Sequence, residues 1–164
     1  NIVAILFGGF ALPFYGVERM TFDLDFLISE SEFEKLINPV KNIGYKLILR
    51  TTQYARFRNE VKEALDIDLV FVDKETIIKI LADATDKRIG DAIFKCASLT
   101  VIMATKLHAI KYNEERRGFQ DINDVIELLL ANSISLDENW FIELCNKYGT
   151  EEIYTRICKI LQKR

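Results

Sequence analysis

Two aspartates, Asp23 and Asp25, stand two residues apart within Thr21–Ile28, a segment in which Phe22, Leu24 and Phe26 alternate with the acids. A period of two is typical of a β-strand and places both carboxylates on one face. Close carboxylates repel each other and are costly to bury unpaired, and a magnesium-like cation would relieve that cost. By itself the pair is explained at least as well by two solvated acids on an edge strand.

A second pair, Asp66 and Asp68, lies within Ala64–Val72, which also predicts a strand. If the two strands are neighbours, a third carboxylate joins Asp23 and Asp25. Three carboxylates can hold two metal ions about 3.5–4 Å apart, which polarise a nucleoside triphosphate and activate an attacking hydroxyl. The alternative is a polar outer face. That alternative is weaker for Asp68, because an apolar run follows it directly.

A Gly8–Gly9 pair follows the apolar run Ile2–Phe7 and precedes a short helix predicted at Phe10–Tyr15. Glycine lets the backbone approach a phosphate closely, and the N–H groups that open a helix favour anions. The alternative is a simple tight turn.

The elements that must position these residues form two parts. Strands are predicted at Ile2–Phe7, Thr21–Ile28, Tyr45–Arg50, Gln53–Arg58, Ala64–Val72 and Ala92–Cys96, and helices at Phe10–Tyr15, Glu32–Asn42 and from Asp73 through Leu81. Apolar residues with a period of 3.6 then predict helices at Leu99–Asn113, Asp121–Ala131, Asp137–Tyr148 and Glu151–Leu161. This order predicts an α+β fold, with a mixed sheet flanked by helices over residues 1–97 and a packed helical region over 98–164.

Composition narrows the classes of function. The 164 residues carry a net charge of −3, which excludes a broadly basic nucleic-acid coat. A local basic stretch of Lys46, Arg50, Arg56, Arg58 and Lys62 fits either a nucleic-acid groove or a solvated hairpin. The uncharged segment Ile2–Val17 is too short and too rich in glycine for a membrane span. Three widely spaced cysteines predict reduced thiols and a cytoplasmic protein.

The glycine and aspartate motifs together resemble a known signature. Gly8-Gly9-x-Ala11 and Gly16-x-x-Arg19-x-Thr21-x-Asp23-Leu24-Asp25 are similar to the motif of the DNA-polymerase-beta-like nucleotidyltransferase superfamily. The Arg and Thr before the D-x-D resemble its AbiEii-type branch, which is linked to abortive infection and toxin–antitoxin systems. The resemblance implies that Asp23 and Asp25 bind Mg²⁺ or Mn²⁺. It implies that the third acid is Asp68, with Asp66 the weaker match, and that Gly8, Gly9, Arg19 and Thr21 contact the nucleotide.

The helical part carries a second match. Lys106-Leu107-His108-Ala109, Arg116-Arg117 and Gln120-Asp121-x-x-Asp124 resemble the K-x-x-A…R…K-D-x-x-D motif of that branch, with Gln120 in place of the usual lysine. The resemblance implies that Lys106 points toward the triphosphate and that Arg117, Asp121 and Asp124 belong to the site. The alternatives are a snorkelling surface lysine and a helix-capping or first-turn acid. His108 is expected to be an ordinary histidine.

The resulting expectation is a magnesium-dependent transfer of a nucleoside monophosphate from a triphosphate to a hydroxyl of RNA or protein. The family also implies a cognate toxin or antitoxin partner. One alternative is a catalytically inactive domain of the same fold that binds a nucleotide or a partner, although the presence of Asp68 argues against it. Another is a different metal-dependent phosphoryl enzyme, such as a phosphatase.

Overall fold

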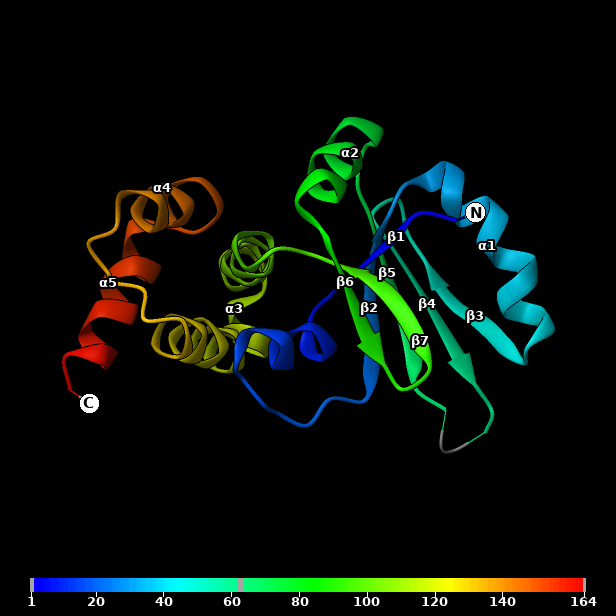
Figure 1. Ribbon diagram of the computed structural model, residues 1–164, viewed down its shortest axis with the longest axis horizontal. Helices are drawn as coiled ribbons and strands as arrows, with labels where there is room; N and C mark the ends of the chain where they lie inside the picture. The colour runs from blue at the N-terminus through cyan, green and yellow to red at the C-terminus, as the bar shows by residue number, and fades with distance from the viewer. Residues whose placement is uncertain (1, 62–63, 164) are drawn as a thin grey trace. The chain divides into compact units, whose positions relative to one another are not determined.

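Figure 1 presents the protein as a computed structural model, which describes residues 2–61 and 64–163 and, at Arg116 and Arg117, the backbone alone. The chain divides into two compact units. The first comprises Asn1–Ala11 and Arg19–Ser98, and the second comprises Leu12–Glu18 and Leu99–Arg164. The N-terminal segment therefore contributes residues to both units.

Within the described residues, the first unit is built on a seven-stranded mixed sheet with the order β3-β4-β5-β2-β1-β7-β6. The strands are β1 (Ala4–Phe7), β2 (Asp23–Ile28), β3 (Tyr45–Arg50), β4 (Tyr54–Asn59), β5 (Asp66–Phe71), β6 (Thr85–Ile89) and β7 (Ala92–Cys96). β2 is parallel to β5 and β1 to β7, whereas the other neighbouring pairs are antiparallel. The two strands that carry the D-x-D pairs are therefore direct neighbours inside the sheet.

Helix α1 (Glu30–Asn42) covers one face of this sheet. Ser29 caps it by accepting a hydrogen bond from the Glu32 amide, so the helix begins at Glu30, two residues before the predicted start. Its Phe33 ring packs against Phe57 of β4 and Phe71 of β5, with centroid separations of 6.0 and 4.9 Å. The buried cluster formed there contains Ile28, Phe33, Val40, Ala55, Phe57 and Leu69. Since side chains alternate along a strand, the neighbours of these residues on β4 and β5 point to the opposite face.

The edge strand β6 is absent from the sequence prediction. Its residues, Thr-Asp-Lys-Arg-Ile, are mostly polar and exposed, so no apolar alternation marks it. β6 pairs antiparallel with β7 through a turn at Gly90, whose φ is +56°. The Gly90-Asp91 dipeptide between the two strands is a hairpin signal that would have found it. Helix α2 (Lys74–Asp83) precedes this hairpin and is capped by Asp73.

The second unit is helical. The 3₁₀ helix η1 (Gly9–Tyr15) enters it at Leu12, and the unit continues with α3 (Leu99–Ala131), α4 (Asn139–Tyr148) and α5 (Glu151–Leu161). Its core is formed by the buried residues Leu12, Ile102, Met103, Leu107, Ile110, Ile122, Val125, Phe141, Ile153 and Ile157. Thr150 caps α5, where its side chain accepts a hydrogen bond from the Ile153 amide.

The sequence predicts two helices where the structure has α3. Residues 114–120 are helical, and the interruption is confined to Asn113, whose φ and ψ are −148° and 42°. That stretch is polar apart from Gly118 and Phe119, and Phe119 is exposed. It therefore lacks the apolar period on which the prediction depends. No helix within residues 2–61 and 64–163 combines the length and apolar composition needed to cross a membrane.

Candidate active site

The register between β2 and β5 brings the two aspartate pairs together. Asp23 lies opposite Asp66, and Asp25 lies opposite Asp68, on adjacent parallel strands. Leu69 of β5 and Ile28 of β2 belong to the core under α1, so the aspartates lie on the other face. Four carboxylates thus share one region of the sheet surface.

Three of these carboxylates converge. One oxygen each from Asp23, Asp25 and Asp68 can be chosen so that all three lie within 4.8 Å of one another. Asp68 is 1% exposed, and the other two are half-buried. Hard cations such as Mg²⁺ and Mn²⁺ prefer carboxylate oxygens, so this donor set fits the metal that the sequence predicts. Asp66 does not belong to the converging set.

Gly8 forms a wall of this cluster. It follows β1, which pairs with β2 so that Phe7 lies opposite Asp25. The Gly8 φ is +65°, and an added Cβ would lie 2.0 Å from Oδ2 of Asp25. Glycine is therefore required here twice, by the left-handed backbone and by the space that the Asp25 carboxylate fills.

Gly9 makes room for two further predicted residues. A Cβ at Gly9 would lie 2.5 Å from Thr21 Oγ1 and 3.1 Å from Arg19 Nη2. The Thr21 hydroxyl donates a hydrogen bond of 2.9 Å to Oδ1 of Asp23, and Arg19 Nη1 donates to the Met20 carbonyl at 3.2 Å. The glycine turn, Arg19, Thr21 and Asp23 therefore form one packed group, in which Thr21 orients Asp23.

Arg56 of β4 belongs to this site, although the sequence indicated it only as a member of the basic stretch. Its Nε donates to Asp68 Oδ1 at 2.6 Å, and its Nη2 donates to Oδ2. These hydrogen bonds raise the pKa of the Arg56 guanidinium. Burial, and then the Asp68 carboxylate, raise the pKa of the adjacent Tyr54. The period-two spacing of Arg56 and Arg58 matches that of the aspartates on β5, which is the signal that could have revealed the pairing.

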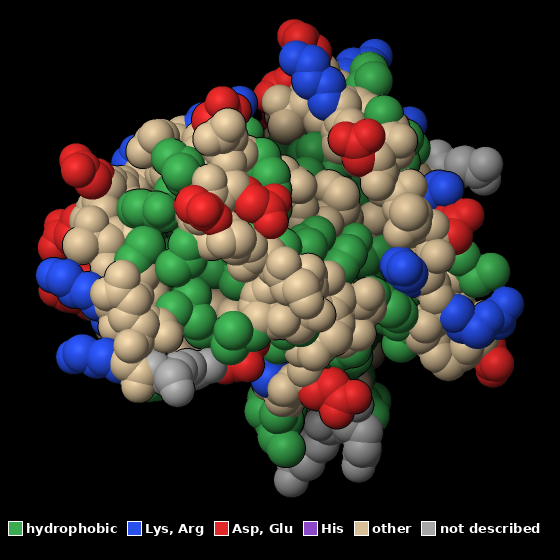
Figure 2. All heavy atoms as spheres, turned by 60° about the vertical axis from the view of Figure 1, so that its left-hand side comes forward, with side chains coloured by type: hydrophobic (Ala, Val, Ile, Leu, Met, Phe, Trp, Pro, Cys, Tyr) green, Lys and Arg blue, Asp and Glu red, His purple; other side chains and the backbone are tan. Residues whose placement is uncertain are grey.

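The described members of the basic stretch are all paired with acids. Arg58 contacts Asp66 at 3.1 Å, Arg50 contacts Glu30 and Glu34 at 3.3 and 2.9 Å, and Lys46 contacts Glu60. Lys62 lies outside the described residues. On the face seen in Figure 2, basic and acidic side chains are interspersed among the residues coloured by type. These pairings favour a solvated hairpin over a nucleic-acid groove.

The second sequence motif forms a buried ionic triad in the helical unit. Lys106 Nζ donates to Asp121 Oδ1 at 2.9 Å and to Asp124 Oδ2 at 2.5 Å. Lys106, Asp121 and Asp124 are 6%, 4% and 5% exposed, and Oδ2 of Asp121 has no hydrogen-bond partner among the described residues. Both simple alternatives are wrong: Lys106 is not a surface lysine, and Asp121 lies inside α3 rather than at a helix start. The side chain of Arg117 lies outside the described residues.

The remaining titratable candidates do not form a site. His108 is exposed, and its ring centroid lies 4.6 Å from that of Tyr112, with the two ring planes tilted by 45°. The three cysteines are free. Burial raises the pKa of Cys96 to about 11 and that of Cys145 to about 12, which keeps both as thiols at neutral pH.

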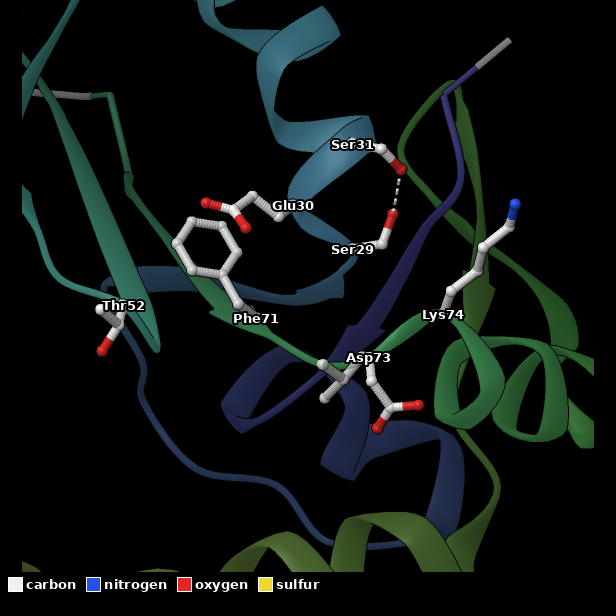
Figure 3. Close-up of a pocket in the computed structure, with 8 residues that line it drawn as sticks. Ser29, Glu30, Ser31, Thr52, Phe71, Asp73 and Lys74 are labelled. Atoms are coloured by element: carbon white, nitrogen blue, oxygen red, sulfur yellow. Dashed lines mark hydrogen bonds between the residues drawn. The ribbon is translucent and has the colours of Figure 1, made fainter.

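A hollow of about 330 Å³ lies at the C-terminal ends of β2 and β5, whereas Asp23 and Asp66 lie at the N-terminal ends of these strands (Figure 3). Its lining residues are Ser29, Glu30, Ser31, Thr52, Phe71, Val72, Asp73 and Lys74. Ser29 and Ser31 are hydrogen-bonded at 3.1 Å, while Ser29 and Asp73 cap α1 and α2. None of the predicted site residues lines this hollow, and two of its polar lining residues, Ser29 and Asp73, act as helix N-caps.

A family model described as "Nucleotidyl transferase AbiEii toxin, Type IV TA system" matches residues 3–154. No curated protein matches the chain significantly.

Solved structures of several nucleotidyltransferases are similar. The lincomycin-bound lincosamide antibiotic adenylyltransferase LnuA has a TM-score of 0.54 and 14% identity, over 81% of this chain and 87% of that chain. ANT(2")-Ia in complex with adenylyl-2"-tobramycin has a TM-score of 0.56 and 14% identity, over 99% and 89%. The Megavirus polyadenylate synthase has a TM-score of 0.54 and 15% identity, over 80% and 28%. At these identities the likeness shows the fold, and the predicted α+β nucleotidyltransferase fold is confirmed.

Proposed function

Because the chain belongs to the AbiEii family of nucleotidyl transferases, we propose that its Asp23–Asp25–Asp68 cluster transfers a nucleoside monophosphate from a triphosphate to an acceptor hydroxyl. The observation that carries the proposal is the convergence of three carboxylates beside the Gly8 backbone. Asp23, Asp25 and Asp68 would hold Mg²⁺, or Mn²⁺ in its place. When bound, such ions neutralise triphosphate charge and favour ionisation of the attacking hydroxyl.

In the proposed reaction, the acceptor oxygen forms a bond to the α-phosphorus. The bond from that phosphorus to the bridging oxygen breaks, and pyrophosphate leaves with the electron pair. Contact of the Gly8 and Gly9 backbone with the phosphates stays a prediction, because the space that a Cβ would take at these glycines is filled by Asp25, Thr21 and Arg19. Thr21 holds the Asp23 carboxylate in one orientation through its 2.9 Å hydrogen bond.

Asp68 is also proposed to take the proton of the acceptor hydroxyl. A carboxylate offers about four lone-pair sites, and Arg56 uses one on each oxygen of Asp68. Two sites remain for a metal or a proton, so the role stays a proposal. The roles in triphosphate binding implied for Arg19, Lys106, Arg117, Asp121 and Asp124 also stay predictions.

The acceptor proposed is a hydroxyl of RNA or protein, and the proposed setting is a cytoplasmic toxin–antitoxin pair. The family description names a toxin of a type IV system, which supports a cognate antitoxin as partner. The three free cysteines support a reducing compartment. The names of two of the similar structures include antibiotics, lincomycin and tobramycin, so these two compounds serve as comparison acceptors in the assay.

The test is transfer of an α-³²P label from each of the four nucleoside triphosphates to RNA, protein or antibiotic, with Mg²⁺ or Mn²⁺. Wild type is expected to label one acceptor and release pyrophosphate. Asp23→Asn is expected to reduce labelling at least a thousandfold, whereas Asp66→Asn, outside the converging set, serves as the matched control. Equal labelling by wild type and Asp23→Asn would show that the cluster is not the active site. Release of inorganic phosphate would indicate a phosphatase.

One observation favours a non-catalytic alternative. Both oxygens of Asp68 already accept hydrogen bonds from Arg56, so the third carboxylate is partly neutralised by the protein itself. In that alternative the domain binds a nucleotide or a partner without transferring label. Calorimetry that detects nucleotide binding, together with no labelling of any acceptor, would support it.

A further inference from the structure

The Arg56–Asp68 pair differs from the Arg58–Asp66 pair beside it, although both join β4 to β5. Arg56 contacts both oxygens of Asp68, and the Asp68 side chain is 2% exposed. Arg58 contacts Asp66 at 3.1–3.4 Å, and those side chains are 57% and 24% exposed. The first pair therefore sits in a poorly screened environment and includes a member of the converging carboxylates, whereas the second is a solvent-screened pair outside it.

Arg56 opposes the binding of a cation to this cluster in two ways. Its positive charge offsets one of the three negative charges that attract a divalent ion, and repels that ion directly. Its two hydrogen bonds also use lone-pair sites on both oxygens of Asp68, the most buried of the three carboxylates. A fourth carboxylate cannot compensate, because Asp66 is engaged by Arg58 and lies outside the set.

The chemistry of the Arg56 guanidinium suits phosphate as well as carboxylate. The Arg56 side chain is 32% exposed, whereas that of Asp68 is 2% exposed, so part of the Arg56 side chain reaches solvent. Tyr54 flanks it, with the guanidinium carbon 5.7 Å from the ring centroid. A planar guanidinium binds phosphate oxygens with the same bidentate geometry as a carboxylate, and a triphosphate carries more negative charge than one aspartate.

We propose that Arg56 couples loading of the metal to arrival of the nucleotide. In the free protein Arg56 occupies Asp68 and keeps the affinity of the cluster for a bare divalent cation low. When a metal–triphosphate complex enters, the phosphates attract the guanidinium and leave Asp68 to the metal. Arg56 is thus a positioning residue that acts through Asp68, and it discriminates a metal–polyphosphate complex from the free ion. This inference rests on the proposed function of the Asp23–Asp25–Asp68 cluster.

The test compares two affinities in Arg56→Gln and in its matched control Arg58→Gln. Binding of Mn²⁺ alone is followed by loss of the free-ion EPR signal. Binding of the Mn²⁺ complex of a non-hydrolysable α,β-methylene triphosphate is followed by calorimetry. Arg56→Gln is expected to bind Mn²⁺ alone at least tenfold more tightly than wild type, and the triphosphate complex at least threefold more weakly. Arg58→Gln is expected to stay within twofold of wild type in both.

The opposite signs separate coupling from simple structural damage, which would weaken both affinities. Arg56→Lys keeps the charge but loses the bidentate contact, so an intermediate gain in Mn²⁺ affinity is expected, and this variant replaces Arg56→Gln if circular dichroism shows that the latter is unfolded. Unchanged or weaker Mn²⁺ binding, or equal tightening of both ligands, overturns the inference.

Asp23→Asn separates this failure from failure of the proposed function. If wild type binds Mn²⁺ and Asp23→Asn does not, the metal cluster exists, and the Arg56 variants then decide the coupling alone. If Mn²⁺ binding is unaffected by Asp23→Asn, the proposed cluster is wrong and the inference fails with it.

Discussion

A Cβ on Gly8 would lie 2.0 Å from Oδ2 of Asp25, so the end of β1 and the centre of β2 fit together only if residue 8 has no side chain. The contact joins the glycine motif to the aspartate motif, although sixteen residues lie between Gly8 and Asp25 along the chain. The two motifs therefore form one site, in which the Asp25 carboxylate leaves no room for a side chain at residue 8.

Gly8→Ala is expected to displace Asp25 and to lower both Mn²⁺ affinity and nucleotide transfer at least a hundredfold. The left-handed backbone alone costs an alanine about 1–2 kcal/mol. Gly90 is the matched control, because its φ is also positive and an added Cβ there meets nothing within 4 Å. Urea unfolding should show a loss of that size in Gly90→Ala with full Mn²⁺ affinity. If Gly8→Ala retains Mn²⁺ affinity, the fit to Asp25 is not functional.

Thr21→Val is expected to lower transfer roughly tenfold, as loss of a hydrogen bond to a charged group predicts, with little change in stability. The substitution keeps the shape of the side chain but removes the hydroxyl that donates to Asp23. Thr21→Ser restores the donor and is expected to recover most of the activity. Initial rates at saturating nucleotide decide this, and equal rates in Thr21→Val and wild type would remove Thr21 from the site.

Lys106→Met is expected to destabilise the protein by about 3–5 kcal/mol, because it leaves two buried carboxylates without their cation. Urea denaturation followed by circular dichroism measures the loss. Lys111→Met, at an exposed position of the same helix, is expected to change stability by less than about 0.5 kcal/mol. A Lys106→Met protein as stable as wild type would contradict the triad as a stabilising unit.

The buried thiols predict a loss of stability in alkaline solution. Burial raises the pKa of Cys96 from its ordinary value of 9.0 to about 11. Below pH 9 both folded and unfolded thiols are protonated, so the full contribution is present; as the pH rises from 9 toward 11, the unfolded thiol ionises first and stability falls. Cys145, with a pKa of about 12, adds to the same effect. Urea midpoints measured at pH 7 and pH 10.5 should differ less in Cys96→Ala than in wild type.

Thiol labelling checks the same burial by a different route. At pH 8 the native protein is expected to react with a disulfide reagent at Cys158, which is half-buried, far faster than at Cys96 or Cys145. All three should react after denaturation. Fast native labelling of Cys96 would show that its environment is not closed.

Elements in which apolar residues form a regular alternation or an uninterrupted run were predictable from the sequence. The alternation in β2 and β5, the apolar run of β1 and the glycine turn are properties of a few consecutive residues, and the structure has each of them within about two residues of the prediction. Polar β6 and the helical stretch 114–120 carry no apolar period, and both were missed. The types of residue at the site, two D-x-D pairs and two glycines, were therefore readable from the chain alone.

The tertiary structure decided how these residues combine. Strand register is a non-local property, and it set Asp25 beside Asp68 while leaving Asp66 to Arg58. The same register put Arg56 on both oxygens of Asp68, a contact that no local pattern states, because the two residues meet only when β4 pairs with β5. Likewise, the sequence left a surface lysine open as the alternative for Lys106, and only the fold shows that Lys106 is buried and paired with Asp121 and Asp124. The periodicity of apolar residues determines to which face of its own strand or helix a side chain points. Which residue of another element that side chain contacts depends on the packing of segments that are distant in the sequence.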